Sequence, residues 1–475
     1  MGNQEKTGRF SQKNSKMSLK RVILLAAFPI SAFLFFSSFS YYFFQDDWFV
    51  TNWARTGNFW SFFAFRTDII YWRPLSMPLL FFITDKLFPL NAAAFHTIAF
   101  SFFAALILAV YKLFDLLLKD KNIAAVGAFL YATWPIHYIS LSWFSTTAYI
   151  IGPLFMVWSY IFFKKNYILS FAFFLMSLAS SEFALVLPAV FLISKIIIGK
   201  DISIKYLLPF FAIDLIYVLA RFFIFPIPAK GEYELILTTR LLNNLIWYIA
   251  WAFGIPERFK ELIFLGLPGQ SLKSLLRFWQ VTLPALVLIF FVLYRLVKSP
   301  KNSYKNYLFG VLWLLAGLSP VILLIGHSYP VYLSFAGIGF LFVILSAFKK
   351  ANNFLVIALL ALWIVLAYNS LKFTKNTHWI RNEQAISKAY TNFAKAQVPD
   401  PSSNSAFVIR PASIAFARDN NFVLVEGEDT LKTSLSGQNA LQVIYNNPAI
   451  KSLFLNLGQD VDLPPDVYIY EITPQ

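Results

Sequence analysis

The chain has 475 residues, of which 58% are hydrophobic and only 13% are charged, whereas an ordinary soluble domain is about 25% charged. Its 54 Phe, 23 Tyr and 13 Trp residues exceed what one soluble core can bury, which excludes a soluble globular protein and favours an all-α bundle in a lipid bilayer. The net charge of +16 lies in short segments between apolar runs, which indicates membrane topology and not nucleic-acid binding, and the lack of Cys excludes disulfides and thiolate chemistry.

The first predicted element is a membrane span at 22–39, preceded by a basic segment at 1–21. The apolar run is long for a signal peptide and ends in Ser-Tyr-Tyr-Phe-Phe, without a small-x-small cleavage site. We therefore expect a retained first span with a cytoplasmic N-terminus.

Eleven apolar runs approach the roughly 20 residues that a span needs, and together they define a transmembrane module at 22–371. Basic clusters occur at every second junction between them, so placing all of these clusters in the cytoplasm puts the C-terminal tail outside. The pair 167–181 and 183–199 is short, and an alternative is two half-length helices that meet at Ser180-Ser181-Glu182. The predicted spans are 22–39, 92–114, 123–141, 147–163, 167–181, 183–199, 206–226, 277–297, 306–325, 331–348 and 353–371.

This topology leaves two large extracytoplasmic loops and an extracytoplasmic tail. Loop 41–91 is predicted to form amphipathic helices at the membrane interface, and loop 226–276 contains an apolar piece, Leu241–Phe253, predicted to be interfacial or re-entrant. The tail at 372–475 is predicted to be a small α/β domain. Its strands are expected at 406–410, 414–418, 422–426 and 467–472, with a helix near 439–445.

Asp46 and Asp47 open the first loop, directly after a span. Paired carboxylates can share a proton, which raises one pKa into the range of a general base, and they can bind a divalent cation such as Mg²⁺ or Mn²⁺. The alternative is a solvated helix cap, because Asp is favoured at helix starts.

Arg73 lies in the same loop, between aromatic residues and Pro74. Arg can hold a phosphate through two hydrogen bonds, and the alternative is a side chain that reaches toward lipid headgroups. Three ionisable residues lie within or beside predicted spans, and such residues usually face a bundle interior or a wet cavity. These are Glu182, Asp214 and Arg221, of which the last two are expected to pair structurally.

All four histidines fall on the outer side in this topology, which favours a role at one membrane face, although His also tolerates interfaces. They are His96, His137, His327 and His378. The lack of Cys and the many Lys and aromatic residues favour the plasma membrane of a prokaryote.

The order of these motifs resembles the GT-C superfamily of membrane glycosyltransferases, in particular the protein O-mannosyltransferase-like group. The matching segments cover roughly residues 20–370. They are Asp46-Asp47, Arg73-Pro74-Leu75, Phe95-His96, Pro135-Ile136-His137, Ser181-Glu182 and the segment from His327 to Tyr332. Ser181 stands where that group has Lys, and a late Arg of the group is missing beside His327.

The resemblance implies transfer of a sugar from a polyprenyl-phosphate donor to an extracytoplasmic protein, lipid or glycan, with inversion. It implies Asp46 as base or metal ligand and Asp47 as its partner. Arg73, with His327 or Arg221, is expected to hold the donor phosphate, and His96, His137, Glu182 and Tyr332 are further site candidates. The alternatives are a transporter or flippase of a lipid-linked glycan, and a non-catalytic scaffold that binds a partner through its tail.

Overall fold

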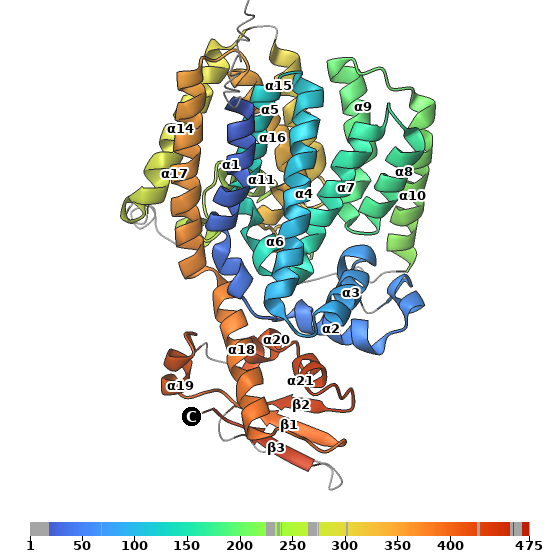
Figure 1. The fold of residues 1–475 in the computed structure, drawn as a ribbon, viewed down its shortest axis with the longest axis vertical. Helices are drawn as coiled ribbons and strands as arrows, with labels where there is room; N and C mark the ends of the chain where they lie inside the picture. Colours follow the sequence, from blue (N-terminus) through green and yellow to red (C-terminus); the bar gives the residue numbers. More distant parts are fainter. Residues whose placement is uncertain are drawn as a thin grey trace, which may run out of the picture.

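The computed structural model describes residues 19–474 except 68, 225–232, 235–237, 239, 265–272, 274, 301–302, 425–427, 457–458 and 460–467. Most of the described chain forms a helical bundle, and the C-terminal strands and short helices lie at one end of it, below α2 and α3 (Figure 1).

The helices and strands have the following bounds. They are α1 (Leu19–Leu34), α2 (Asp46–Thr56), α3 (Leu80–Leu87), α4 (Ala92–Leu118), α5 (Lys121–Ala132), α6 (Tyr138–Ser142), α7 (Ala148–Phe162), α8 (Tyr167–Leu178), α9 (Leu187–Ile198), α10 (Leu208–Phe223), α11 (Arg240–Ala252), α12 (Phe259–Phe264), α14 (Trp279–Lys298), α15 (Tyr304–Leu318), α16 (Leu333–Phe348), α17 (Asn353–Thr377), α18 (Trp379–Gln397), α19 (Ile414–Asp419), α20 (Glu428–Ser434), α21 (Asn439–Ile444), β1 (Ser405–Ile409), β2 (Lys451–Phe454) and β3 (Tyr468–Ile472).

Six helices in the described part of the chain are long and apolar enough to cross a membrane, so the chain is a helical membrane bundle. The number of eleven spans is not confirmed, because the helices in the other predicted segments, such as α1 with 16 residues and α5 with 12, are shorter than a full span. The six are Ala92–Leu118, Phe144–Phe162, Ile204–Phe223, Trp279–Lys298, Pro330–Phe348 and Asn353–Thr377.

The helices of the bundle differ in how much of their apolar surface is exposed. Large apolar side chains are exposed along α10 and α14, including Phe222, Phe223 and Phe290, whereas α16 is buried along most of its length. Exposed apolar faces of this kind suit contact with lipid.

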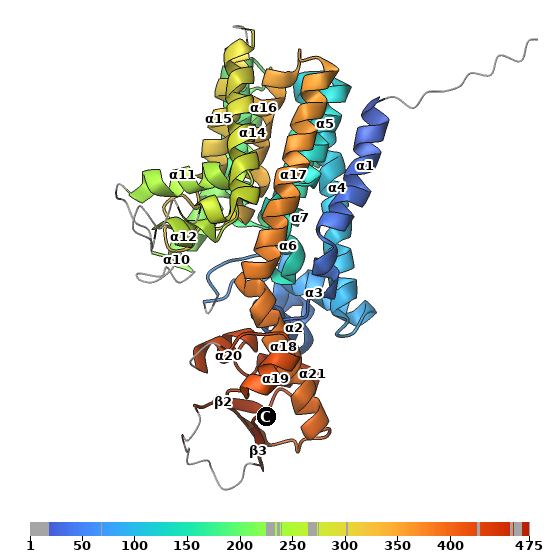
Figure 2. The same cartoon turned by 90° about the vertical axis from the view of Figure 1, so that its left-hand side faces the viewer.

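Two predicted features of the loops can be compared with the structure. Helix α2 does not lie free at an interface, because Trp48, Val50 and Ala54 are buried in one core with residues of α3 and of the C-terminal part. Helix α11 contains most of Leu241–Phe253, and its 13 residues extend only about 20 Å. Figure 2 shows it lying across the direction of α14.

The C-terminal residues form a three-stranded parallel sheet in the order β2-β1-β3, with Ala406 opposite Lys451 and Ile469. Strands β1 and β3 and helix α21 lie where the sequence predicts them. The strand predicted at 414–418 is wrong: this segment is helix α19, because the Ser413 side chain accepts a hydrogen bond from the Phe416 amide and caps a helix start. Part of the strand predicted at 422–426 lies outside the described residues.

Candidate active site

A tight turn directly before α2 positions the aspartate pair. The Asp47 amide donates to the Phe44 carbonyl over 3.0 Å, and Gln45 has φ 47° and ψ −125°. These values match the second residue of a type II′ turn, a position that favours Gly because a side chain there is strained. Asp46 is the next residue, so its direction is set by a strained backbone.

The C-terminal part of the chain holds this turn. The Gln45 amide donates to the Ser434 carbonyl over 3.1 Å, and the Gln45 side chain donates to the carboxylate of Glu383. Burial raises the pKa of Glu383 to about 7, although the bond from Gln45 lowers it. Further along α2, Asn52 donates to Asn439 and Gln442.

Asp47 is buried, with 1% of its surface exposed, and its Oδ1 accepts from the backbone amide and the hydroxyl of Ser145 at 2.8 and 2.6 Å. Burial raises its pKa to about 7, while the Ser145 hydrogen bonds lower it. Asp47 therefore ties α2 to the 3₁₀ turn Phe144–Thr147. This is a positioning contact, and it uses one of the two carboxylate oxygens.

Asp46 has different surroundings, because it lines a surface hollow of about 420 Å³ between α2 and α20. Its carboxylate makes no hydrogen bond with any residue that the structure describes. Burial raises the pKa of Asp46, and the positive charge of Arg73 lowers it. The far side of the hollow is formed by Asp429, Lys432 and Ser436.

Arg73 is held in one orientation by a carboxylate and two rings. Its Nε donates to Glu182 Oε2 over 2.7 Å, and its Nη2 donates to Glu182 Oε1 and, over 3.1 Å, to the Tyr149 hydroxyl. The rings of Tyr71 and Tyr149 lie 4.7 and 5.1 Å from the guanidinium carbon. Within the described chain, Nη1 is left without a hydrogen bond.

The backbone around Arg73 is fixed to the junction that contains Glu182. The Leu75 amide donates to the Ala179 carbonyl, and the Ser76 hydroxyl donates to the Ser180 carbonyl over 2.6 Å. This junction lies between α8 and the 3₁₀ turn Glu182–Val186, where the sequence places the end of one short helix and the start of the next. The Arg-Pro-Leu and Ser-Glu motifs are therefore parts of one site.

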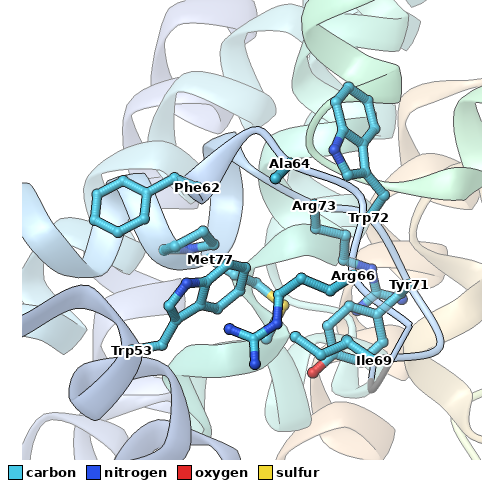
Figure 3. Close-up of a pocket in the computed structure, with 10 residues that line it drawn as sticks. Trp53, Phe62, Ala64, Arg66, Ile69, Tyr71, Trp72, Arg73 and Met77 are labelled. Carbon is cyan, nitrogen blue, oxygen red and sulfur yellow. The ribbon is translucent and has the colours of Figure 1, made fainter. Parts of the chain in front are cut away.

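The loop segment beside Arg73 closes over a hollow of only about 10 Å³, which holds at most one water molecule. Figure 3 shows Trp53, Arg66 and Tyr71 gathered on one side of this segment, with Trp72 pointing away from them. The Arg66 guanidinium lies 4.8 Å from the Trp53 ring. A phosphate reaches Arg73 from this side only if the segment moves.

Three more predicted residues adjoin the Arg73–Glu182 pair. The Tyr332 ring packs on Tyr149 at 5.2 Å and on Phe183 at 5.3 Å, and the His327 ring lies 6.2 Å from Tyr332. Arg221 is close enough to Glu182 to stabilise its charge. The pairing of Asp214 with Arg221 stays a prediction: Asp214 Oδ1 is buried without a hydrogen bond in the described part of the chain.

Two predicted histidines lie away from this cluster. His96 Nδ1 bonds to the Leu141 carbonyl at 3.0 Å, and the His137 ring is buried between Phe103 and Tyr131 at 4.7 and 4.6 Å. Both contacts are typical of histidines that pack and orient a core. His378 lies between α17 and α18, and its Nε2 lies 3.3 Å from Glu257 Oε2.

The aspartate pair alone offers a metal ion fewer oxygen ligands than a hard cation requires. Hard cations take several oxygen ligands, but Asp47 is bonded to Ser145. Over the described residues, no group of three or more His, Asp or Glu side chains gathers at any point. No chemical step is therefore assigned to a metal.

Sequence reasoning missed Ser145, Tyr149 and Glu383. Tyr149 lies in the predicted span 147–163, and Ser145 lies just before that span, although the structure includes both in one helical segment, Phe144–Phe162. Glu383 lies more than 300 residues from its partner Gln45. Only the polar Ser-Thr-Thr run at 145–147, unusual inside a span, gives a signal that one of them is used.

Comparison of the sequence with protein-family models gives no match, and the comparison with curated proteins finds no significant relative. The chemistry of the site is therefore inferred from its own residues.

Proposed function

We propose that this chain is a GT-C-type glycosyltransferase that moves a sugar from a polyprenyl-phosphate donor to a hydroxyl acceptor outside the cytoplasm. The observation that carries the proposal is the Arg73 guanidinium, which Glu182 holds in one orientation and whose Nη1 makes no hydrogen bond within the described chain. Asp46 lies close enough to Arg73 for this positive charge to lower the pKa of Asp46. This arrangement offers a cation for a phosphate leaving group and a base for an acceptor at one end of a membrane bundle.

Arg73 supplies the electrostatic part of the reaction. When the bond between the anomeric carbon and the phosphate oxygen breaks, the phosphate keeps the electron pair and gains negative charge. Glu182 accepts hydrogen bonds from Nε and Nη2 of Arg73 and so holds the guanidinium in place. Nη1 can therefore stabilise the negative charge of the phosphate without a change in the orientation of the guanidinium. Arg221 and His327 lie at the edge of this cluster and are proposed to assist, while Tyr149 and Tyr332 shield it.

Asp46 is proposed to remove the proton from the acceptor hydroxyl as its oxygen bonds to the anomeric carbon from the face opposite the phosphate. This attack gives inversion, and the proton ends on Asp46. Burial raises the pKa of Asp46, which makes it a stronger base than an exposed aspartate. The hollow of about 420 Å³ beside Asp46 gives the acceptor an approach that is separate from the Arg73 side.

The finer topology belongs to the same proposal. Eleven crossings with a cytoplasmic N-terminus place α2 and the tail outside the cytoplasm, in the plasma membrane of a prokaryote. Helices α2 and α18 lie at the same end of the bundle, so the number of crossings between them must be even (Figure 1). Ten crossings between these helices satisfy this requirement.

The test is transfer by purified full-length protein in proteoliposomes, offered a panel of polyprenyl-phosphate sugars and read by mass spectrometry of released sugar and glycosylated product. Asp46→Asn should reduce transfer at least about 100-fold, the scale of general-base catalysis. Asp47→Asn keeps an oxygen for Ser145 and should lose less than about tenfold. In the parent protein, transfer should rise with pH as Asp46 loses its proton, and Asp46→Asn should lack this rise.

Three outcomes would contradict the proposal. Full activity in Asp46→Asn removes the base assignment. Movement of a lipid-linked glycan across the membrane without a covalent product indicates a transporter. Loss of cellular function on deleting residues 373–475, with no effect of Asp46 or Arg73 substitutions, indicates a scaffold.

A further inference from the structure

A second, larger hollow lies at the other end of the bundle, away from the C-terminal strands. It has a volume of about 960 Å³ and is lined by residues from the C-terminal end of α4, the start of α5, the end of α7 and the start of α1. These helix ends lie far from the C-terminal strands (Figure 1). None of its residues belongs to the Arg73 and Asp46 site, so it requires its own explanation.

Positive charge dominates the rim of this hollow. Five lysines line it, together with only two aspartates. One of these, Asp120, already accepts hydrogen bonds from the Asn122 and Ile123 amides as the N-cap of α5. No salt bridge within the described residues joins any of the five lysines to a carboxylate. They are Lys20, Lys112, Lys119, Lys121 and Lys165.

The backbone at the rim is also unusual. Lys119 has φ 53° and ψ 38°, a left-handed conformation in which Gly or Asn is usual at a helix end. Keeping Lys there costs stability, and strained positions of this kind cluster at ligand sites. The charges crowd as well, since burial and then the positive charges of Lys119 and Lys164 lower the pKa of nearby Lys200.

The floor of the hollow is apolar. Leu116, Trp158, Ile161 and Phe162 line it, and the last three lie in the final turns of a helix that is long and apolar enough to span a membrane. Aromatic residues with lysines at the end of a span mark the level of lipid headgroups. A basic rim above an apolar floor matches a molecule with an anionic head and a hydrocarbon tail.

We propose that this hollow binds an anionic phospholipid of the adjacent leaflet, with its phosphate among Lys112, Lys119 and Lys121 and the start of its acyl chain on Trp158 and Phe162. Charge complementarity and the position at the end of the spans commit the site to a lipid instead of a soluble anion. The inference is independent of the glycosyltransferase proposal.

The experiment is native mass spectrometry of the full-length protein released from nanodiscs that contain phosphatidylglycerol and phosphatidylcholine. A retained phosphatidylglycerol is expected on the parent protein. The variant Lys119→Gln/Lys121→Gln should lose about 25-fold in affinity, at about fivefold for each lysine. The matched control is Lys349→Gln/Lys350→Gln, which removes two exposed lysines that do not line the hollow and should keep the lipid.

Two results overturn the proposal. Equal loss of lipid in both double variants shows general attraction of a basic protein to an anionic membrane. Competition by soluble glycerol phosphate at concentrations equal to those of the lipid shows that the ligand is a free phosphate and not a lipid.

Discussion

The two ends of the bundle differ in whether their charged and strained residues have bonding partners within the protein. At the α2 end, Arg73 is paired with Glu182, Asp47 with Ser145, and the strained Gln45 is held by Ser434 and Glu383. At the other end, the strained Lys119 and the other four lysines that line the hollow have no salt bridge to a carboxylate in the described chain. Charges already satisfied within the protein suit a preorganised reaction site, whereas unsatisfied charges suit a ligand from outside.

The largest effect is expected from breaking the Arg73–Glu182 pair. Arg73→Gln removes the guanidinium that is hydrogen-bonded to Glu182 and leaves only the charge of Arg221 nearby. It should lower the free energy of unfolding by about 3 kcal/mol, the lower end of the range for a buried pair, because Glu182 is 29% exposed. Tryptophan fluorescence during thermal unfolding in detergent measures it. The double variant Arg73→Gln/Glu182→Gln should recover part of the stability but no transfer activity.

Arg55→Gln is the matched control for that variant. It breaks another ion pair at this end, with Asp85 at 2.7 Å, and also removes a hydrogen bond to the Val443 carbonyl. It should lose stability and keep transfer activity. Equal loss of activity in the Arg55 and Arg73 variants would show that Arg73 acts only through stability.

A smaller effect concerns pH and the hold of the tail on the Gln45 turn. The pKa of Glu383 is about 7 in the folded protein and 4.5 ordinarily, so the folded state binds more protons between these values. Stability should therefore fall as pH rises from about 4.5 to 7. Glu383→Gln stays neutral, so it should flatten this slope and add about 2–3 kcal/mol at pH 8, because each unit of the pKa difference is worth about 1.4 kcal/mol. Melting temperature across pH measures the change.

An unchanged slope in Glu383→Gln would assign the pH dependence to another group, with Asp47 as the next candidate, since its pKa is also about 7. Glu471→Gln is a suitable control because its side chain is 58% exposed and it lies at the far edge of the C-terminal sheet. It should leave the slope unchanged.

The smallest effect separates backbone strain at the two ends. At Gln45 and at Lys119, Gly and Ala both remove the side chain, but only Gly accepts a positive φ without strain. Gly should be more stable than Ala by about 1–2 kcal/mol at Gln45 and by about 1 kcal/mol at Lys119, whose left-handed values are less restricted. Chemical denaturation in detergent measures both differences, and equal stability of Gly and Ala would show that neither turn is strained.

The helices were more predictable than their contacts. The lengths of the apolar runs located α4 and α17, because a membrane span requires a continuous run of apolar residues that is visible directly in the sequence. The segment 123–141 is one exception: helix α5 ends at Ala132, just before Pro135, which disfavours the helical conformation in the residue that precedes it. A single proline hardly changes the mean hydropathy of a run of this length, so the hydropathy pattern did not predict this helix end.

The site was predictable only as separate pieces. Arg73 and Glu182 stood out as charges among apolar residues, yet their pairing joins positions 109 apart and depends on how α7, α8 and the first loop pack. The two aspartates are adjacent in sequence, and only the structure distinguishes them, since Ser145 bonds Asp47 and a hollow adjoins Asp46.

The hold of the tail on the Gln45 turn has a consequence for biosynthesis. The ribosome completes Gln45 long before Glu383 and Ser434, its partners in the folded chain. During that interval the nascent turn lacks both restraints, even when the first helices are already inserted. The contacts that hold the turn before Asp46 therefore form last, after the tail has been synthesised, and a chain that stops early lacks them.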